Sequence, residues 1–459
     1  MTGQRPLRVA VVGSGPAGFY TAGAIQASEL AVQVDMIERL PTPWGLVRAG
    51  VAPDHPNIKA VSRAFEKIAR VEGFRFFGNV EVGRDVGHSD LVRLYDAVVY
   101  TVGAQADRRL GIPGEDLPGS WAATEFVAWY NGHPDFQDRA FDLSGERALV
   151  IGNGNVAVDV ARMLALTEEE LAPTDATDEA IAAIAGSGIH EIVMLGRRGP
   201  AQAAFTPPEL QELGELASAE VVVDPADLEL DPARAAALED DRATARRNLD
   251  ILREYATRAP AGKAKRLVMR FCVSPVAILG EGKVEAVEIV RNVLVADEGG
   301  RISARATEEL EVIPCSLVLR SVGYRGIPLP GLPFHEAHGV IPNVGGRVTG
   351  DDGATLRGVY CAGWIKRGPS GVIGTNKKDA AETVELLLQD ARAGVLTHDA
   401  DRTLEALLAE RGAEVVEYEG WEVIHEHELA RGRERGRPRV KLATWEELLE
   451  RARQLGSQG

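Results

Sequence analysis

Two glycine-rich hexapeptides in this chain have the residue types and spacing needed to hold a phosphate group. The first is Gly13-Ser14-Gly15-Pro16-Ala17-Gly18, and the second is Gly152-Asn153-Gly154-Asn155-Val156-Ala157. Glycines at these positions allow a tight turn and let backbone N–H groups approach a pyrophosphate at the N-terminus of the following helix. A glycine-rich turn without a ligand is the alternative for each loop, so the interpretation depends on the neighbouring elements.

The charged residues that follow the two loops differ in sign. Glu38 lies 25 residues after Gly13, near the spacing expected of an acid that binds a ribose 2′-hydroxyl. Because an acid there repels a 2′-phosphate, the first loop favours FAD or NAD. Arg197 and Arg198 follow the second loop, and their forked donors suit a 2′-phosphate. Unless this pair is merely solvated, the second loop prefers NADP(H) over NAD(H), and together the sites imply a flavoprotein that uses NADPH.

The elements that position these loops follow the strand, loop, helix, strand order of a dinucleotide-binding unit. Residues 7–12 and 147–151 are apolar and rich in β-branched types, which predicts a buried parallel strand directly before each loop. A helical pattern follows each loop, and strands predicted at residues 33–37 and 191–195 end beside the charged residues. Residues 167–188 are predicted to form an inserted helical segment, which accounts for the greater length of the second unit.

Two further junctions between a strand and a glycine predict that one nucleotide domain is inserted into the other. Strands predicted at residues 96–102 and 316–322 close on glycines, and we interpret them as the two passages between domains. Residues 1–104 and 322–459 would then form a discontinuous FAD domain with a C-terminal extension, and residues 105–321 the NADP domain. The predicted fold class is α/β, with two Rossmann-like dinucleotide-binding domains.

A third glycine-rich loop, residues 368–375, follows a predicted strand that ends in Gly363-Trp364. An amphipathic helix is predicted over residues 378–388. The N-terminus of such a helix would offer backbone amides and positive potential to a phosphate or to the pyrimidine edge of a flavin. Trp364 could contact a cofactor there, and filling of the core is the alternative.

The composition excludes several classes of protein. The chain has 459 residues, of which 45% are hydrophobic and 26% charged, as in a globular protein of two to four domains. A net charge of −17 argues against a nucleic-acid binder that relies on bulk charge. The three cysteines lie far apart in sequence, so we expect no disulfide scaffold, zinc ribbon, CxxC redox pair or cysteine-ligated iron–sulfur cluster. The alternating His425-Glu426-His427 falls on a segment expected at the surface, and we predict no metal site. Without an apolar run of 18 residues or a signal segment, we expect no membrane span and a cytoplasmic location.

Nine segments, in order along nearly the whole chain, are similar to those of one family. The more specific ones include PTPWGLVRAGVAPDHP from Pro41, LGRRGPAQAAFTPPELQEL from Leu195 and GWIKRGPSGVIGTNKKDA from Gly363. They resemble the ferredoxin–NADP reductases of the adrenodoxin reductase type, in the actinobacterial branch. The resemblance implies hydride transfer from NADPH to FAD N5 and then single-electron transfer to a small iron–sulfur ferredoxin, or the reverse, with a cytochrome P450 as one possible destination.

The same resemblance implies which residues bind the two cofactors. For FAD they are Gly13, Gly15, Ala17, Gly18, Glu38, Leu46, Val82, Trp364, Gly371, Val372 and Ile373. For NADP(H) they are Arg108, Asn153, Gly154, Asn155, Val156, Arg197, Arg198, Glu209 and Gly371.

Three residues are implied to act in catalysis. His55 resembles the family's histidine beside the flavin, where it could relay the proton that accompanies flavin reduction. Asp159 and Glu209 would be its partners in such a relay. The alternatives are that His55 caps a loop between two prolines and that Asp159 makes a plain hydrogen bond.

An acidic ferredoxin requires a local positive surface on an enzyme of net charge −17. Residues 242–270 hold nine basic residues against two acids, and Arg242, Arg246 and Arg253 are spaced to share one helix face. We predict that this face docks the ferredoxin; a solvated helix is the alternative. Two other functions stay open, an NADPH diaphorase or oxidase with a small organic acceptor and a redox-silent nucleotide-binding sensor, and the oligomeric state is not predicted.

Overall fold

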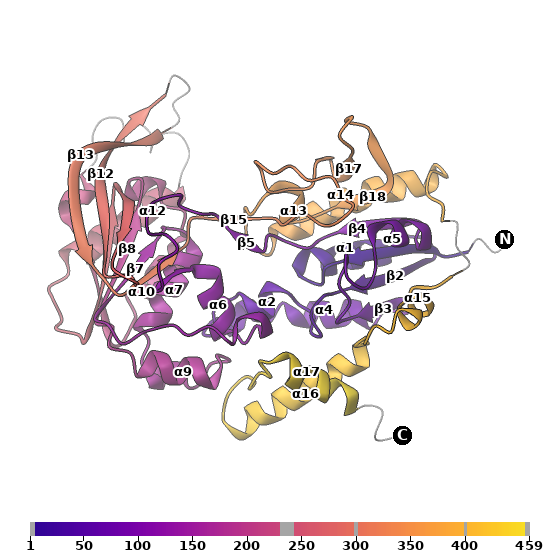
Figure 1. Cartoon of the computed structure of the whole chain (residues 1–459), viewed down its shortest axis with the longest axis horizontal. Coiled ribbons are helices and arrows are strands. Elements are labelled where there is room, and N and C mark those ends of the chain that lie inside the picture. The colour runs from indigo at the N-terminus through magenta and orange to yellow at the C-terminus, as the bar shows by residue number, and fades with distance from the viewer. Residues whose placement is uncertain (1–4, 230–242, 298–301, 399–401, 455–459) are drawn as a thin grey trace. The chain divides into compact units, whose positions relative to one another are not determined.

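The computed structural model describes residues 5–229, 243–297, 302–398 and 402–454. The chain divides into two compact units (Figure 1). The first unit comprises Met1–Val51, His55–Ala106 and Gly323–Gly459, and the second comprises Ala52–Asp54 and Asp107–Val322. The chain passes between the units at β5 (Ala106–Asp107) and just before β15 (Tyr324–Arg325).

The first unit is built on a seven-stranded sheet in which β3, β2, β1, β4 and β18 run parallel (Figure 1). In order across the sheet the strands are β16 (Asn343–Val344), β17 (Arg347–Thr349), β18 (Thr355–Cys361), β4 (Ala97–Tyr100), β1 (Leu7–Val12), β2 (Val32–Ile37) and β3 (Phe74–Phe77). Strand β1 pairs with both β2 and β4, so it lies in the interior of the sheet. Val9, Ala10 and Val11 are fully buried there, as an apolar parallel strand requires.

Helices cover this sheet and extend beyond it. Helix α1 (Pro16–Gln26) packs against α14 (Thr375–Arg392), and the C-terminal helices α16 (Tyr418–Glu434) and α17 (Trp445–Arg453) pack against each other. Trp421 of α16 lies in the same core cluster as Val9 of β1 and Val34 of β2. The remaining helices are α2 (Leu46–Ala49), α3 (Pro56–Lys59), α4 (Ser62–Ala69), α5 (His88–Leu94), α13 (Trp364–Arg367) and α15 (Leu404–Glu410).

The second unit contains a six-stranded, entirely parallel sheet. In order across the sheet the strands are β6 (Ser120–Ala122), β14 (Leu317–Arg320), β7 (Arg147–Ile151), β8 (Glu191–Gly196), β10 (Lys265–Phe271) and β9 (Ala219–Val223). Its helices are α6 (Ala123–Tyr130), α7 (Asn155–Ala165), α8 (Glu168–Leu171), α9 (Asp178–Ala185), α10 (Pro207–Leu213) and α12 (Ala243–Thr257). A buried cluster that includes Leu164 of α7, Ile192 of β8 and Leu252 of α12 joins sheet and helices.

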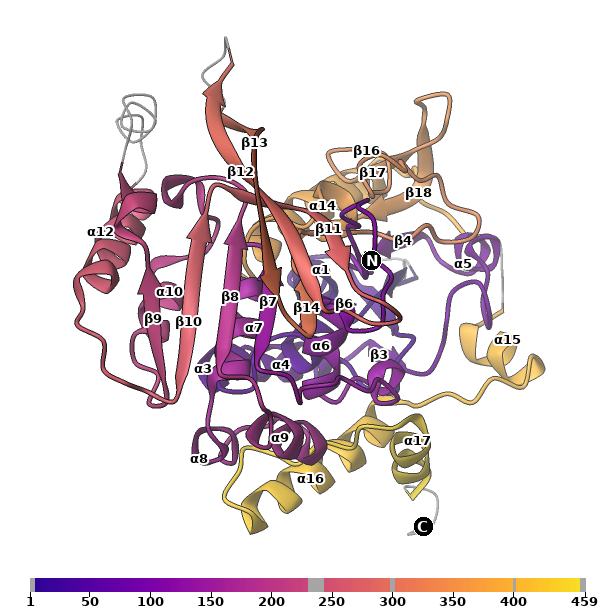
Figure 2. The ribbon, with the colours of Figure 1, turned by 60° about the vertical axis from the view of Figure 1, so that its left-hand side comes forward.

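A three-stranded antiparallel sheet is added to the second unit. It consists of β11 (Val273–Leu279), β12 (Ala286–Ala296) and β13 (Ile302–Pro314), and β12 and β13 form a long hairpin (Figure 2). A single residue, Cys272, separates the parallel strand β10 from β11. The antiparallel sheet is therefore attached directly to the end of a strand of the parallel sheet.

Most local predictions are confirmed, and the differences concern boundaries. The strand before the second loop has the predicted bounds, and the inserted segment forms α8 and α9 as expected. Helix α1 begins at Pro16, inside the glycine-rich hexapeptide and not after it as predicted, because proline is well suited to the first position of a helix. Helix α14 extends beyond the predicted residues 378–388 at both ends. Among the described helices, none is long and apolar enough to cross a bilayer.

Candidate nucleotide-binding sites

The first glycine loop leaves a backbone surface open to a ligand. Gly13 turns the chain after β1 at φ +102°, where a Cβ would lie 2.8 Å from the carbonyl oxygen of Thr101. In contrast, no described atom lies within 4 Å of a Cβ built on Gly15. The neighbouring strand therefore requires the first glycine, whereas the second leaves room beside the N-terminus of α1. A pyrophosphate can approach the backbone at that position.

The second loop repeats this geometry in the other unit. Gly152 has φ +141°, and a Cβ there would collide with the carbonyl oxygen of Ser321. A Cβ on Gly154 meets no described atom within 4 Å. Ser321 follows β14 as Thr101 follows β4, and each of these strands pairs with the strand that carries the loop. The two loops are structurally equivalent.

Glu38 directs its carboxylate onto the first loop. One oxygen accepts hydrogen bonds from the backbone N–H (2.9 Å) and the hydroxyl group (2.7 Å) of Ser14. The other oxygen accepts a hydrogen bond from the N–H of Leu40 at 3.0 Å. The end of β2 thus holds a negative charge beside the loop, where it can accept a hydrogen bond from a ribose and disfavours a 2′-phosphate.

Gly363 and Trp364 lie beside the helix that begins at the first loop. Gly363 has φ +79°, and a Cβ there would lie 2.6 Å from the Cβ of Ala17. Trp364 stacks on Tyr324 with ring centroids 5.8 Å apart. Its indole Nε1 is buried and has no hydrogen-bond partner among the described residues. Buried donors are normally satisfied, so this one fits a site where a cofactor supplies the acceptor.

The third glycine-rich loop exposes its backbone at the start of α14. Gly371 has φ +79°, and Val372 is 61% exposed even though it is a large apolar residue. Ile373 packs partly against the core around β1. Of the other residues expected to contact FAD, Leu46 is 49% exposed, whereas Val82 is buried and would reach a ligand through its main chain.

Arg197 and Arg198 follow β8 directly, and their main chain is anchored to the protein. The carbonyl oxygen of Arg197 accepts a hydrogen bond from Nδ2 of Asn292 at 2.9 Å, and that of Arg198 accepts one from the N–H of Cys272 at 3.1 Å. The side chain of Arg197 is exposed, that of Arg198 is half-buried, and Arg108 is exposed as well. An exposed guanidinium group at the end of β8 has the chemistry that suits a 2′-phosphate, and the assignment of these arginines to NADP(H) stays a prediction.

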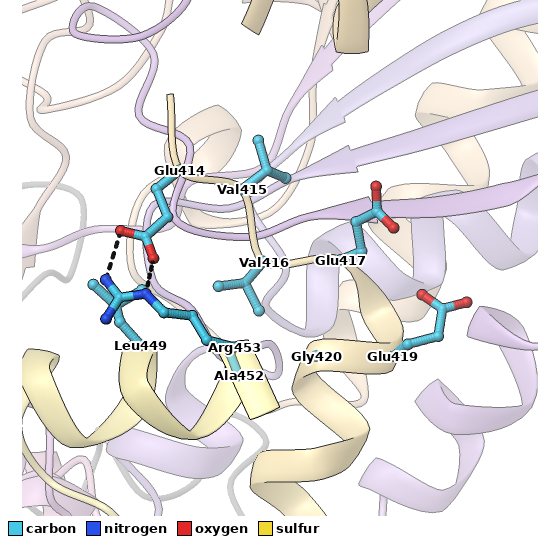
Figure 3. A pocket seen from close by; sticks show the side chains of 9 residues that line it. All are labelled: Glu414, Val415, Val416, Glu417, Glu419, Gly420, Leu449, Ala452 and Arg453. Carbon is cyan, nitrogen blue, oxygen red and sulfur yellow. Dashed lines mark hydrogen bonds and ion pairs between the residues drawn. The ribbon is translucent and has the colours of Figure 1, made fainter. Parts of the chain in front are cut away.

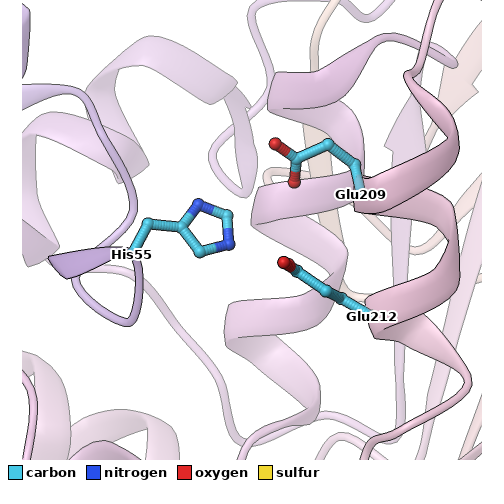
Figure 4. Close-up of side chains that lie close together, drawn as sticks. All are labelled: His55, Glu209 and Glu212. Carbon is cyan, nitrogen blue, oxygen red and sulfur yellow. The ribbon is translucent and has the colours of Figure 1, made fainter. Parts of the chain in front are cut away.

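The second loop is joined to helix α10 through residues 204–206. The carbonyl oxygen of Asn153 and Oδ1 of Asn155 accept hydrogen bonds of 2.8–3.2 Å from backbone N–H groups of this segment. Helix α10 then starts on two prolines, as the sequence predicted. Glu209 and Glu212 lie one turn apart on the same face of α10 (Figure 4). The loop therefore positions the helix that carries these two carboxylates.

Comparisons with known proteins agree with this arrangement. Residues 7–194 match the family described as pyridine nucleotide-disulphide oxidoreductase. The NADPH-ferredoxin reductase FprA of Mycobacterium leprae is 50% identical over 452 residues, which are 96% of this chain and 97% of that protein. A solved structure described as Mycobacterium tuberculosis FprA in complex with NADPH has 50% identity and a TM-score of 0.92, and the match covers 98% of this chain and 100% of that one. The mitochondrial NADPH:adrenodoxin oxidoreductase of Arabidopsis thaliana is 42% identical over 97% of this chain and 95% of that protein.

The chain belongs to the ferredoxin–NADP reductases of the adrenodoxin reductase type. The family resemblance and the α/β fold class expected from the sequence are thereby confirmed. The enzyme is an oxidoreductase, so a redox-silent sensor is no longer a competing interpretation.

His55 and Asp159, two of the residues predicted to act in catalysis, lie in different local environments. His55 is 9% exposed and stands at the N-terminus of α3, and its side chain caps no helix N–H among the described residues (Figure 4). The relay role of His55 and the alternative of a loop-capping residue both stay predictions. Oδ1 of Asp159, on α7, accepts a hydrogen bond from Nη2 of Arg162 at 2.6 Å. For Asp159 the alternative of a hydrogen-bonded residue is correct, and its part in proton relay stays a prediction.

Arg162 was not among the predicted site residues of the reductase, although it organises the carboxylates around it. Its guanidinium is buried, pairs with Asp54 and Asp159, and lies 4.0 Å from Glu212. Burial lowers the pKa of Arg162, and the charges of Glu212 and Glu209 oppose that shift. The only local signal in the sequence is the i, i+3 spacing of Asp159 and Arg162.

The basic stretch of residues 242–270 does not form one positive surface. Arg242 lies outside the described residues, and Arg246 and Arg253 are exposed on α12. Arg253 lies 3.5 Å from Asp250. Other bases of the stretch are engaged by Glu254, Glu191, Glu311 and the carbonyl oxygens of Leu216 and Leu164. The local excess of positive charge is therefore smaller than the composition of the stretch indicated.

A pocket lies between the C-terminal helices of the first unit and the segment before α16 (Figure 3). Arg453 and Glu414 form a bidentate ion pair at its edge, with distances of 2.6 and 3.0 Å. The other lining residues are Val415, Val416, Glu417, Glu419, Gly420, Leu449 and Ala452. Its carboxylates disfavour an anionic ligand such as a nucleotide, and its lining shares no residue with the predicted sites.

Proposed function

We propose that this chain catalyses electron transfer between NADPH and a ferredoxin, with FAD bound by the first unit and NADP(H) by the second. The observation that carries the proposal is the pair of equivalent glycine loops, one beside the carboxylate of Glu38 and one followed by Arg197 and Arg198. Relatives named NADPH-ferredoxin reductase, 50% identical over nearly the whole chain, support it. When bound, FAD would supply hydride acceptance from NADPH and the one-electron release that an iron–sulfur protein requires.

In the first unit, the chain's own groups suit the parts of FAD. The backbone of residues 13–18 would hold the pyrophosphate, and Glu38 would accept a hydrogen bond from the ribose. The backbone of residues 371–373 would offer N–H groups and the positive end of α14 to the edge of the flavin. The buried indole N–H of Trp364 would donate to the same cofactor.

In the second unit, the guanidinium groups of Arg197 and Arg198 would bind the 2′-phosphate of NADP(H), and the backbone of residues 153–156 its pyrophosphate. Arg108 adds a further positive charge for the phosphates. Glu209 is a further residue of this unit that we propose for NADP(H).

Several finer assignments rest on the family resemblance and on single features. We propose that His55 relays a proton during flavin reduction, and that Arg246 and Arg253 contribute to ferredoxin docking. Delivery of electrons to a cytochrome P450 and a cytoplasmic location stay predictions.

An anaerobic titration of the purified holoenzyme with NADPH and, separately, with NADH tests the proposal. We expect the flavin absorbance to bleach at much lower NADPH than NADH, and the reduced enzyme to pass electrons to a ferredoxin. Faster turnover with a quinone than with any ferredoxin would instead support a diaphorase. A flavin that neither nucleotide reduces would overturn the proposal.

A further inference from the structure

The peptide groups of Arg197 and Arg198 are held by residues that are remote in sequence. Asn292 of β12 donates from Nδ2 to the carbonyl oxygen of Arg197 at 2.9 Å and to the hydroxyl oxygen of Ser274 at 2.8 Å. Both protons of this amide nitrogen are thereby used. Asn292 is 4% exposed, so its side chain is too buried to contact a bound nucleotide directly.

The backbone around Asn292 is fixed on both sides of β12. The register of β12 against β13 shifts between Val290 and Asn292, where residues 307–309 of β13 face the single residue Arg291, so the extra residues lie on β13. On the other side, Arg291 pairs with Val273 of β11. The N–H of Asn292 also donates to the carbonyl oxygen of Cys272 at 2.7 Å, which ties β12 to the junction of β10 and β11.

Cys272 completes the anchor from the other side. It is buried and has φ +55°, a left-handed conformation that is uncommon for a residue with a side chain. In this conformation its N–H donates to the carbonyl oxygen of Arg198 at 3.1 Å. Consecutive carbonyl groups of the arginine pair are thus fixed toward the antiparallel sheet, while the side chain of Arg197 projects into solvent.

We infer that Asn292 is a positioning residue for the discrimination between NADP(H) and NAD(H), acting through the main chain of Arg197. The inference rests on the proposed binding of the 2′-phosphate by Arg197 and Arg198. A loop that is held before the ligand arrives loses less conformational entropy when its guanidinium groups bind. Removal of the hydrogen bond from Asn292 therefore weakens the binding of ligands that carry a 2′-phosphate, and it leaves the contacts with the rest of the nucleotide unaffected.

The test measures binding of 2′,5′-ADP and of 5′-AMP to the FAD-loaded enzyme by calorimetry. For Asn292→Leu we expect the Kd of 2′,5′-ADP to rise about 5- to 10-fold, the effect of about one hydrogen bond, and that of 5′-AMP by less than about 2-fold. KM for NADPH should rise with kcat unchanged. In Asn292→Thr the side chain suits a strand but is too short to reach the carbonyl oxygen, so the Kd of 2′,5′-ADP should rise in the same way. This variant is used in place of Asn292→Leu if Asn292→Leu does not fold.

Ser274→Ala is the matched control, because it removes the second partner of the same amide and leaves the contact with Arg197. It should change neither Kd by more than about 2-fold. An equal loss of 2′,5′-ADP binding in Ser274→Ala would assign the effect to packing of the sheet and overturn the inference. In an Arg197→Ala, Arg198→Ala background, Asn292→Leu should have no further effect on 2′,5′-ADP.

The Arg197→Ala, Arg198→Ala variant also distinguishes an error in the proposed phosphate site from an error in the proposed role of Asn292. If it binds 2′,5′-ADP as well as the wild type, the proposed phosphate site is wrong and the inference falls with it. If it loses binding while Asn292→Leu and Asn292→Thr keep it, the phosphate site stands and the role of Asn292 is wrong.

Discussion

Glu428 and Arg48 form a buried bidentate ion pair, with distances of 2.6 and 2.7 Å between side chains that lie 380 positions apart in sequence. Arg48 belongs to α2, which begins two residues after Trp44, and Glu428 belongs to α16. The N–H of Trp44 donates to the carbonyl oxygen of Ser14 in the first glycine loop at 3.0 Å. The ring of Trp44 meets Trp421 of α16 edge-on, with centroids 4.9 Å apart. The C-terminal extension is therefore linked, through α2, to the loop that we propose binds FAD.

Glu428→Gln tests this link. The substitution leaves the guanidinium of Arg48 buried without its full counter-charge, and loss of one partner of a buried pair costs about 3–5 kcal/mol of unfolding free energy. We expect a lower Tm and faster release of FAD, measured by the rise of flavin fluorescence. Glu419→Gln, at an exposed position on the same helix, is the control. Unchanged FAD release in a destabilised Glu428→Gln protein would show that the extension does not support the loop.

His425 predicts a pH dependence of stability. Its ring packs against Trp44 and Trp421, and burial together with the charge of Arg439 lowers its pKa to about 4. The unfolded histidine protonates near pH 6.5, so between that pH and about pH 4 the unfolded state binds a proton that the folded state does not bind. The free energy of unfolding should fall between about pH 6.5 and pH 4. Urea unfolding at pH 7.0 and 5.5 measures the difference, which should shrink in His425→Gln; an equal difference in the variant would contradict the assignment.

Gly154→Ala tests whether the open space beside Gly154 is needed for ligand binding but not for folding. The backbone of Gly154 is extended, and a Cβ there meets no described atom, so the protein should fold with an unchanged Tm. The methyl group would occupy the place of the pyrophosphate, and we expect NADP⁺ binding to weaken roughly tenfold or more. Gly152→Ala is the contrasting variant, because its Cβ would strike the carbonyl of Ser321 and lower the Tm. Normal NADP⁺ affinity in Gly154→Ala would exclude this loop as the phosphate site.

Replacement of both Arg197 and Arg198 by alanine should reduce kcat/KM for NADPH far more than for NADH. Each charge-assisted contact contributes roughly 1.5–3 kcal/mol, so the expected loss with NADPH is about 10²- to 10⁴-fold. Steady-state reduction of ferricyanide with each nucleotide measures it. Equal losses with both nucleotides would contradict the assignment of the 2′-phosphate.

Reversal of charge on α12 tests the docking surface. Arg246→Glu should raise the KM for an acidic ferredoxin several-fold at low ionic strength, and less at high salt, because the interaction is electrostatic. NADPH–ferricyanide activity should not change. Arg305→Glu makes the same charge change at an exposed position of β13 and should have little effect on ferredoxin. A ferredoxin KM that is equal in both variants would remove α12 from the docking surface.

The residues that could be assigned from the sequence are those whose role is local. The apolar strand β7, the glycines at positions 152 and 154 and the arginines at the end of β8 follow one another in a pattern of strand, turn and helix. Each step depends on backbone geometry and on neighbours within a few residues. For the same reason the opposite charges of Glu38 and the arginine pair were sufficient to predict two different nucleotides.

Only the tertiary structure decided which distant residues support these loops. Asn292 lies 95 positions from Arg197, and Ser321 explains why Gly152 must be glycine, yet nothing in the local sequence pairs them. Counted along the chain, residues 242–270 form one continuous basic segment. In the fold this segment is divided between α12 and β10, and many of its basic side chains form ion pairs with acidic residues. Local sequence determines strands and turns through backbone preferences, but the order of strands in a sheet brings remote side chains together, and that order is set by the packing of the whole core.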